Sequence, residues 1–137
     1  LGDATQLVVS FTPPAGTAAI TSYQFTTNGS TWTTAVGAGS PITLTGLTGN
    51  TRYTALQIRA VNASGAGTAS VTMTGITAPA APTSPVATGV ASQPNKLSVA
   101  FNAVNGGAAT AIVNYEYSLN AGVTWAAVAP ITAGTPT

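Results

Sequence analysis

The chain has 137 residues, of which 45% are hydrophobic and only 4% are charged, and its formal net charge at pH 7 is +1. Ordinary soluble domains carry about 25% charged residues, so this composition excludes a basic stripe for nucleic acid and a polybasic patch for a membrane surface. The chain contains no cysteine and no histidine, which excludes disulfides and thiolate or imidazole metal sites. No apolar run approaches the roughly 18 residues that a membrane helix needs.

Alternating apolar residues predict strands through the first half of the chain, and helical periodicity appears nowhere. We expect strands at 6–11, 20–27, 31–35, 42–44 and 69–74, together with a long strand from Leu56. In that long strand Leu56, Ile58 and Ala60 are predicted to face inward. The triplet Asn28-Gly29-Ser30 is typical of a hairpin turn. The sequence therefore predicts an all-β fold.

A corner precedes the long strand and contains Leu47 and Tyr53. A tyrosine here packs its ring inside the fold, while its hydroxyl reaches back to the backbone of the corner. We predict a structural role for both residues.

The same pattern begins again after a connector rich in proline, alanine and threonine. Lys96–Phe101, Ile112–Ser118, Asn120–Trp125 and Pro130–Ile131 repeat segments found about 90 residues earlier. A period of about 90 residues corresponds to one sandwich domain per repeat. We predict a first repeat at 1–77 that lacks its first strand, a linker at 78–85 and the front half of a second repeat at 86–137.

The second repeat contains no counterpart of the segment that begins at Leu47. Half a sandwich leaves an apolar face open and strand edges unpaired. We therefore expect residues beyond Thr137, or another chain, to complete it, and we expect 1–137 to be a window from a longer tandem array.

Several motifs resemble the fibronectin type III repeats of bacteria and phages. They are Leu7-Val-Val-Ser-Phe11, Ile20-Thr-Ser-Tyr23-Gln-Phe25, Asn28-Gly-Ser-Thr-Trp32, Leu47-Thr-Gly-Asn-Thr-Arg-Tyr53 and Arg59-Ala-Val-Asn62-Ala-Ser-Gly65-Ala-Gly67. The resemblance implies tandem antiparallel sandwiches of seven strands in two sheets. It also implies a multidomain protein outside the cell or on a virion, where such modules serve as spacers, adhesins or assembly contacts.

Two features depart from the usual pattern of that family, and a third observation concerns the motif by which some relatives bind integrins. Phe11 and Phe101 stand where the family often has tryptophan. The segment from Tyr53 to Leu56 is one residue longer than usual, which predicts a β-bulge. The loop at 62–67 lacks Arg-Gly-Asp, so integrin binding is not expected.

Residues that could carry catalysis are few. Lys96 and Ser98 are the nearest approach to a nucleophile and base, but we expect both to face solvent on a strand whose inward face is Leu97, Val99 and Phe101. Asp3 and Glu116 are the only carboxylates and belong to different repeats, so a glycosidase pair is not expected. We predict no catalytic, cofactor-binding or metal site.

Trp32 and Trp125 recur at the same position of the repeat. An exposed tryptophan can stack on a sugar ring or contact a partner, but a tryptophan beside a hairpin more often covers the edge of a sandwich. Both residues are kept as candidate glycan or partner contacts. Arg52 and Arg59 are expected to be solvated residues whose stems cover apolar surface.

These patterns predict a non-enzymatic structural or adhesion module of a large assembly exposed at a surface. The assembly would be a phage appendage, a capsid surface or a cell-surface repeat protein. The expected partners are other subunits or neighbouring repeats, with surface glycans as a further candidate, and neither nucleic acid nor membrane insertion is expected. The alternative is a carbohydrate-binding or spacer module of a secreted glycan hydrolase.

Overall fold

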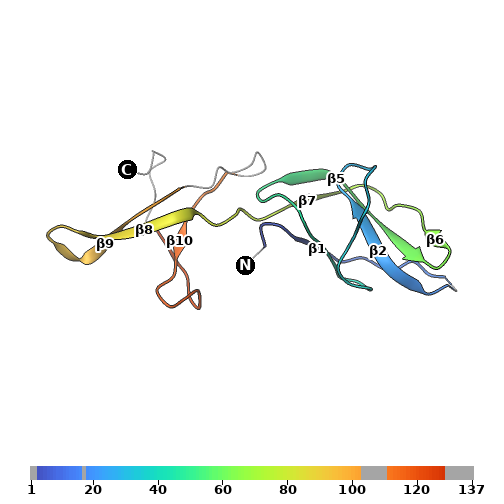
Figure 1. The fold of residues 1–137 in the computed structure, drawn as a ribbon, viewed down its shortest axis with the longest axis horizontal. Coiled ribbons are helices and arrows are strands. Elements are labelled where there is room, and N and C mark those ends of the chain that lie inside the picture. Colours follow the sequence, from blue (N-terminus) through green and yellow to red (C-terminus); the bar gives the residue numbers. More distant parts are fainter. Residues whose placement is uncertain (1–2, 17, 103–110, 129–137) are drawn as a thin grey trace. The chain divides into compact units, whose positions relative to one another are not determined.

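The computed structural model describes residues 3–16, 18–102 and 111–128. Within these ranges the protein is all-β, with antiparallel strands and no helix. The chain forms two compact units, the first extending to Ala80 and the second beginning at Ala81 (Figure 1). The expected linker at 78–85 spans this division, and the first strand of the second unit begins within it.

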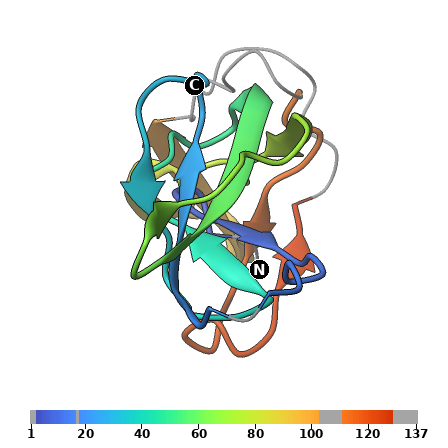
Figure 2. The ribbon, with the colours of Figure 1, turned by 90° about the vertical axis from the view of Figure 1, so that its right-hand side faces the viewer.

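Unit 1 contains two antiparallel sheets. Its strands are β1 (Leu7–Val9), β2 (Ile20–Thr26), β3 (Thr33–Thr34), β4 (Ile42–Leu44), β5 (Arg52–Asn62), β6 (Gly65–Ala66) and β7 (Met73–Ile76). One sheet pairs β1 with β4, and the other has the order β3-β2-β5-β6, with β7 also paired to β5. Figure 2 shows β1 (dark blue) beside β4 (cyan) and β2 (blue) beside β5 (green).

The core of unit 1 lies between these two sheets. Its buried hydrophobic residues are Tyr23, Phe25, Ala35, Ile42, Leu44, Leu47, Leu56 and Ile58. Ile42 and Leu44 of the β1–β4 sheet are 0% exposed, and Leu56 of the other sheet is 1% exposed. Burying an aliphatic side chain of this size contributes about 1.5–3 kcal/mol. The two sheets therefore pack face to face as a β-sandwich.

The long strand β5 follows the predicted alternation. Leu56 and Ile58 are buried, whereas Gln57 and Arg59, which alternate with them, are only partly buried. The strand starts earlier than expected and includes Tyr53. Its register against β7 shifts between Tyr53 and Leu56, which confirms the irregularity predicted there.

Two other expected strands have different bounds, because side-chain hydroxyls replace part of the ladder. The strand predicted at 69–74 begins only at Met73. The Oγ of Ser70 accepts a hydrogen bond of 3.1 Å from the N–H of Ile58. Similarly, the N–H of Phe11 donates to the Oγ of Ser40 at 2.9 Å, and β1 ends at Val9.

Unit 2 consists of two strand pairs. They are β8 (Thr83–Val90) with β9 (Gln93–Asn102), and β10 (Glu116–Tyr117) with β11 (Ala126–Ala127). The strand predicted at 112–118 is therefore reduced to β10. Leu97 and Val99, predicted to face inward, are 65% and 50% exposed, and the other residues of β9 from Gln93 to Ala100 are exposed as well, so the inward orientation of Leu97 and Val99 stays a prediction.

Aromatic contacts of unit 1 recur in unit 2. The ring centroids of Phe11 and Tyr23 are 4.8 Å apart, and those of Phe101 and Tyr115 are also 4.8 Å apart. Such a pair contributes about 0.5–1.5 kcal/mol beyond its buried area.

The hairpin turns also match. The Oδ1 of Asn28 accepts from the N–H of Thr31 at 2.9 Å, and the Oδ1 of Asn120 accepts from the N–H of Thr124 at 2.8 Å. An asparagine side chain therefore binds the backbone across the turn in both units, three residues ahead in unit 1 and four residues ahead in unit 2.

Candidate functional site

The corner before β5 is held by hydrogen bonds to its backbone. The hydroxyl of Tyr53 accepts a 2.8 Å hydrogen bond from the N–H of Thr48. Leu47 is 7% exposed, and its N–H donates to the carbonyl of Thr5 at 3.0 Å. Leu47 and Tyr53 thus fix the direction in which the chain enters β5.

Thr77 closes the same corner from the far end of unit 1. It is 2% exposed, and its hydroxyl donates to the carbonyl of Thr48 at 2.6 Å while accepting from the N–H of Thr51 at 3.0 Å. Sequence reasoning did not single out this residue, because one threonine among many carries no local signal.

Trp32 lies against the outer face of the β2–β5 pair. Gln24 and Arg59 are register partners on these two strands, and the Arg59 Nε and Nη2 donate to the Gln24 Oε1 at 2.9 and 2.7 Å. The guanidinium carbon of Arg59 lies 4.0 Å from the ring centroid of Trp32. A cation over the face of an indole is attracted by the negative π-face.

Arg59 was expected to be a solvated residue. This expectation was wrong for the guanidinium group, which donates hydrogen bonds to Gln24 and lies over the ring of Trp32. The predicted alternation of β2 and β5 puts Gln24 and Arg59 on the outward face, so the sequence indicated which face of the sheet each side chain occupies. The pairing register that makes them neighbours required the structure. With Arg59 against one face of its ring, Trp32 has less surface to offer a sugar.

Trp125 has a different environment. It is 48% exposed, and its indole N–H donates to the carbonyl of Gly122 at 3.1 Å. The chain's two arginines, Arg52 and Arg59, both belong to unit 1. Trp125 therefore has no counterpart of the guanidinium that covers Trp32 within the chain.

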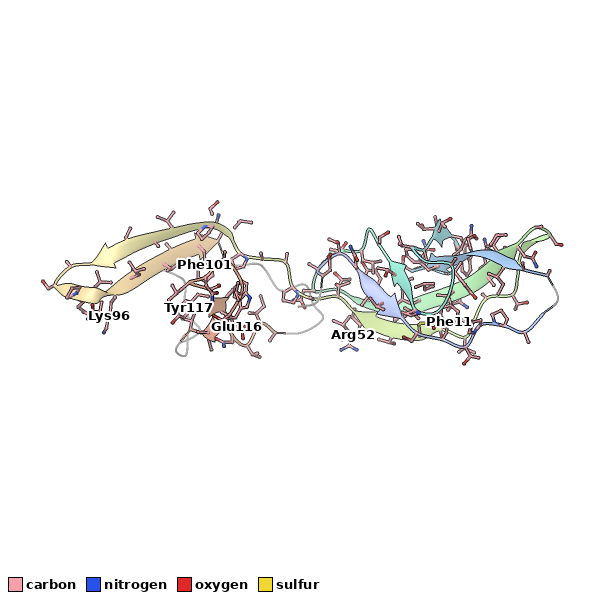
Figure 3. The ribbon with its side chains drawn as sticks, turned by 90° about the horizontal axis from the view of Figure 1, so that it is seen from below. Phe11, Arg52, Lys96, Phe101, Glu116 and Tyr117 are labelled. Carbon is pink, nitrogen blue, oxygen red and sulfur yellow. The ribbon has the colours of Figure 1, made fainter. Side chains whose placement is uncertain are left out.

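The residues considered for catalysis are Lys96 and Ser98 on β9 and the two carboxylates, Asp3 and Glu116. Lys96 and Ser98 are exposed on β9, and Figure 3 shows Lys96 at the end of the hairpin remote from Phe101. Asp3 and Glu116 belong to separate units. The carboxylate of Asp3 accepts from the N–H and the hydroxyl of Thr5, both at 2.7 Å, and these bonds hold the pKa of Asp3 below its ordinary value.

The described residues contain no group of three or more His, Cys, Asp or Glu side chains that could hold a metal ion. In the part of the chain that the structure describes, no helix has the length and apolar character to cross a bilayer.

Comparison with known proteins adds no relative. No protein-family model matches this sequence, and no curated protein matches it.

Proposed function

We propose that this chain is a non-enzymatic structural module built of fibronectin type III-like repeats. Its role is spacing, display or subunit contact in a large assembly at a virion or cell surface. The observation that carries the proposal is the recurrence in unit 2 of local contacts from unit 1, namely the 4.8 Å aromatic pair and the turn closed by asparagine. Repetition of one supersecondary pattern is characteristic of tandem arrays.

The small number of charges supports assembly. Five charged side chains in the chain provide little electrostatic repulsion between neighbouring modules. The polar surface of threonine, serine and asparagine hydrogen-bonds without being screened by salt. Such a surface suits close packing of modules outside the cell, with other subunits or neighbouring repeats as partners.

Labelling of the native assembly tests this proposal. Antibodies raised against residues 1–137 would be applied to intact particles or cells and located by immunogold electron microscopy. We expect label at the surface with regular spacing, and loss of label after preincubation of the antibody with the purified chain. Label that appears only after the particle or cell has been opened would overturn the proposal.

A carbohydrate-binding role is the second candidate, because Trp125 is 48% exposed and an exposed indole can stack on a sugar ring. Fluorescence titration with polysaccharides tests it in the Trp32→Phe variant, in which Trp125 is the single tryptophan. A saturable change in emission supports glycan binding, and an unchanged spectrum counts against it.

A further inference from the structure

The turn between β2 and β3 contains the dipeptide Asn28-Gly29, and both residues are exposed. An asparagine followed by glycine is prone to lose its side-chain nitrogen as ammonia in water. The glycine nitrogen attacks the side-chain carbonyl carbon, and glycine has no β-carbon to obstruct the approach. The sequence thus places a reactive pair at the surface, and the hydrogen bonds around it decide how fast it reacts.

The side-chain carbonyl of Asn28 is surrounded by donors. Its Oδ1 accepts from the N–H groups of Ser30 and Thr31, both at 2.9 Å. It also accepts from the hydroxyl of Thr26 at 3.1 Å. Donors aimed at a carbonyl oxygen stabilise the negative charge that develops there when the carbon is attacked. The turn therefore activates the amide of Asn28.

The attacking nitrogen, by contrast, is held by Thr26. This side chain is 1% exposed, and its Oγ1 accepts from the N–H of Gly29 at 3.0 Å and from that of Asn28 at 3.3 Å. A hydroxyl has one donor and two acceptor lone pairs, so Thr26 uses its whole hydrogen-bonding capacity within this turn. The bond to Thr26 restrains the Gly29 nitrogen from losing its proton and from rotating toward the Asn28 Cγ.

The matching turn of unit 2 lacks the reactive pair. Ser118 takes the place of Thr26, and its Oγ donates to the Oδ1 of Asn120 at 2.9 Å. The residue after Asn120 is Ala121, and the N–H that binds the Ser118 Oγ at 2.8 Å belongs to Gly122. The β-carbon of Ala121 obstructs attack on Asn120, so two similar turns differ in reactivity.

We propose that Asn28 is a site of hydrolytic deamidation whose rate in the folded chain is set by the hydroxyl of Thr26. The Gly29 nitrogen forms a bond to the Asn28 Cγ, the C–N bond of the side-chain amide breaks, and ammonia leaves with the proton from the Gly29 nitrogen. Water then adds to either carbonyl of the resulting imide ring and returns a proton to the nitrogen. The products are aspartate and isoaspartate.

Either product changes the surface next to Trp32. The new carboxylate lowers the formal net charge of the chain from +1 to zero. Isoaspartate also adds a carbon atom to the main chain between β2 and Trp32, whose ring lies 4.0 Å from the guanidinium carbon of Arg59. Deamidation therefore irreversibly alters the turn that positions the contact between Trp32 and Arg59.

The test incubates the folded full chain at neutral pH and follows each asparagine by fragmentation mass spectrometry. Resolution by position is needed because a second pair, Asn105-Gly106, lies outside the described residues. Thr26→Val keeps the shape of the side chain and removes the hydroxyl, and it should raise the rate at Asn28 about five- to tenfold, the effect of one hydrogen bond. Thr26→Ser keeps the hydroxyl and should change the rate less than about twofold. Circular dichroism verifies that the variants fold.

Two controls separate the Thr26 bond from a general loosening of unit 1. Tyr53→Phe removes a hydrogen bond at the corner of the same unit and should leave the rate at Asn28 within about twofold of the wild type. In denaturant, the wild type and both Thr26 variants should react at Asn28 at one common rate that is faster than in the folded wild type. Asn120 should react more slowly than Asn28 in each denatured chain.

An unchanged or lower rate in folded Thr26→Val would overturn the proposal, as would an equal acceleration by Tyr53→Phe. Equal rates at Asn28 in the folded and denatured wild type, or a difference among the Thr26 variants that persists in denaturant, would also overturn it. The wild-type comparison holds even where Thr26→Val does not fold. None of these results affects the surface labelling, so the proposed function is tested separately.

Discussion

At the scale of the residue, single polar side chains substitute for missing strand hydrogen bonds. Tyr53 and Thr77 bind backbone groups that lie outside the sheets, and Ser70 binds the N–H of Ile58 within β5. No buried side-chain nitrogen or oxygen among the described residues lacks a partner. In a protein with so few charges, stability at the corners therefore rests on neutral hydrogen bonds.

Tyr53→Phe should lower the free energy of unfolding of unit 1 by about 1 kcal/mol, because the N–H of Thr48 loses its acceptor while the ring stays in place. Urea denaturation followed by circular dichroism measures the change. Thr48→Ala is the matched control, because it keeps the backbone N–H and should have little effect. Equal stability of the phenylalanine variant and the wild type would refute the role given to this hydroxyl.

Asp3 should have a pKa below the usual aspartate range. The larger cause of this lowered pKa is the hydrogen bond from the backbone N–H of Thr5, and the smaller cause is the bond from the Thr5 hydroxyl. Since the folded-state pKa is depressed, these bonds favour folding above the unfolded-state pKa, and this contribution disappears as the pH falls through the folded-state pKa. NMR titration of the Asp3 carboxyl carbon measures the midpoint. Thr5→Ala should raise it only part of the way, because the backbone bond remains; an unchanged midpoint would contradict this assignment.

At the scale of the element, β5 organises unit 1. It pairs with β2, β6 and β7, its inward residues fill the core, and its outward Arg59 contacts Trp32. Gly75 lies on β7, which pairs with β5. A β-carbon added at Gly75 would lie 2.7 Å from the Cδ1 of Leu7 and 2.9 Å from the Cδ1 of Leu56, so this position is tightly packed.

Gly75→Ala should therefore destabilise unit 1 by about 1–3 kcal/mol, since the added methyl overpacks a filled core. Thermal unfolding measures the loss as a lowered Tm. Gly39→Ala is the matched control, because nothing lies within 4 Å of a β-carbon at Gly39. A Tm for the Gly75 variant at or above that of the control would show that the leucines move aside freely.

At the scale of the whole molecule, the two units differ in how completely they bury their apolar residues. The fully buried hydrophobic residues in the described ranges all belong to unit 1. In unit 2, Tyr117 at the position equivalent to the buried Phe25 is 47% exposed, and Leu97 at the position equivalent to the partly buried Leu7 is 65% exposed. Without a closed core, a unit gains little hydrophobic free energy to offset its conformational entropy.

Hydrogen exchange should consequently be uneven along the chain. Amides of β2 and β5 should be protected by the global stability of unit 1, whereas those of β8 to β11 should exchange much faster. Mass spectrometry of exchanging peptides measures this difference. Equal protection of β5 and β9 would mean that unit 2 is closed in solution by a contact not seen among its described residues.

The sequence predicted the all-β class, the main strands of unit 1 and the bulge after Tyr53. These features follow from local pattern, because alternation with a period of two requires one buried face and a glycine-containing turn sets where a strand reverses. Strand ends at 69–74 and 112–118 were predicted less well. At 69–74 the hydrogen bond between Ser70 and Ile58 replaces part of the strand pairing. At 112–118 the described residues pair with β11 only at Glu116 and Tyr117. Both outcomes depend on residues that are distant in the sequence.

The sequence by itself also determined what this protein lacks, since the types and numbers of its side chains exclude disulfides, histidine chemistry and a strongly charged surface. Only the tertiary structure decided what the tryptophans contact. Arg59 reaches Trp32 because β2 and β5 are neighbours in a fixed register, whereas Trp125 beside β11 remains 48% exposed. Trp32 and Trp125 thus stand at equivalent positions but have different environments. Arg59 belongs to a strand distant in the sequence from Trp32, and only the pairing of β2 with β5 brings the two residues together.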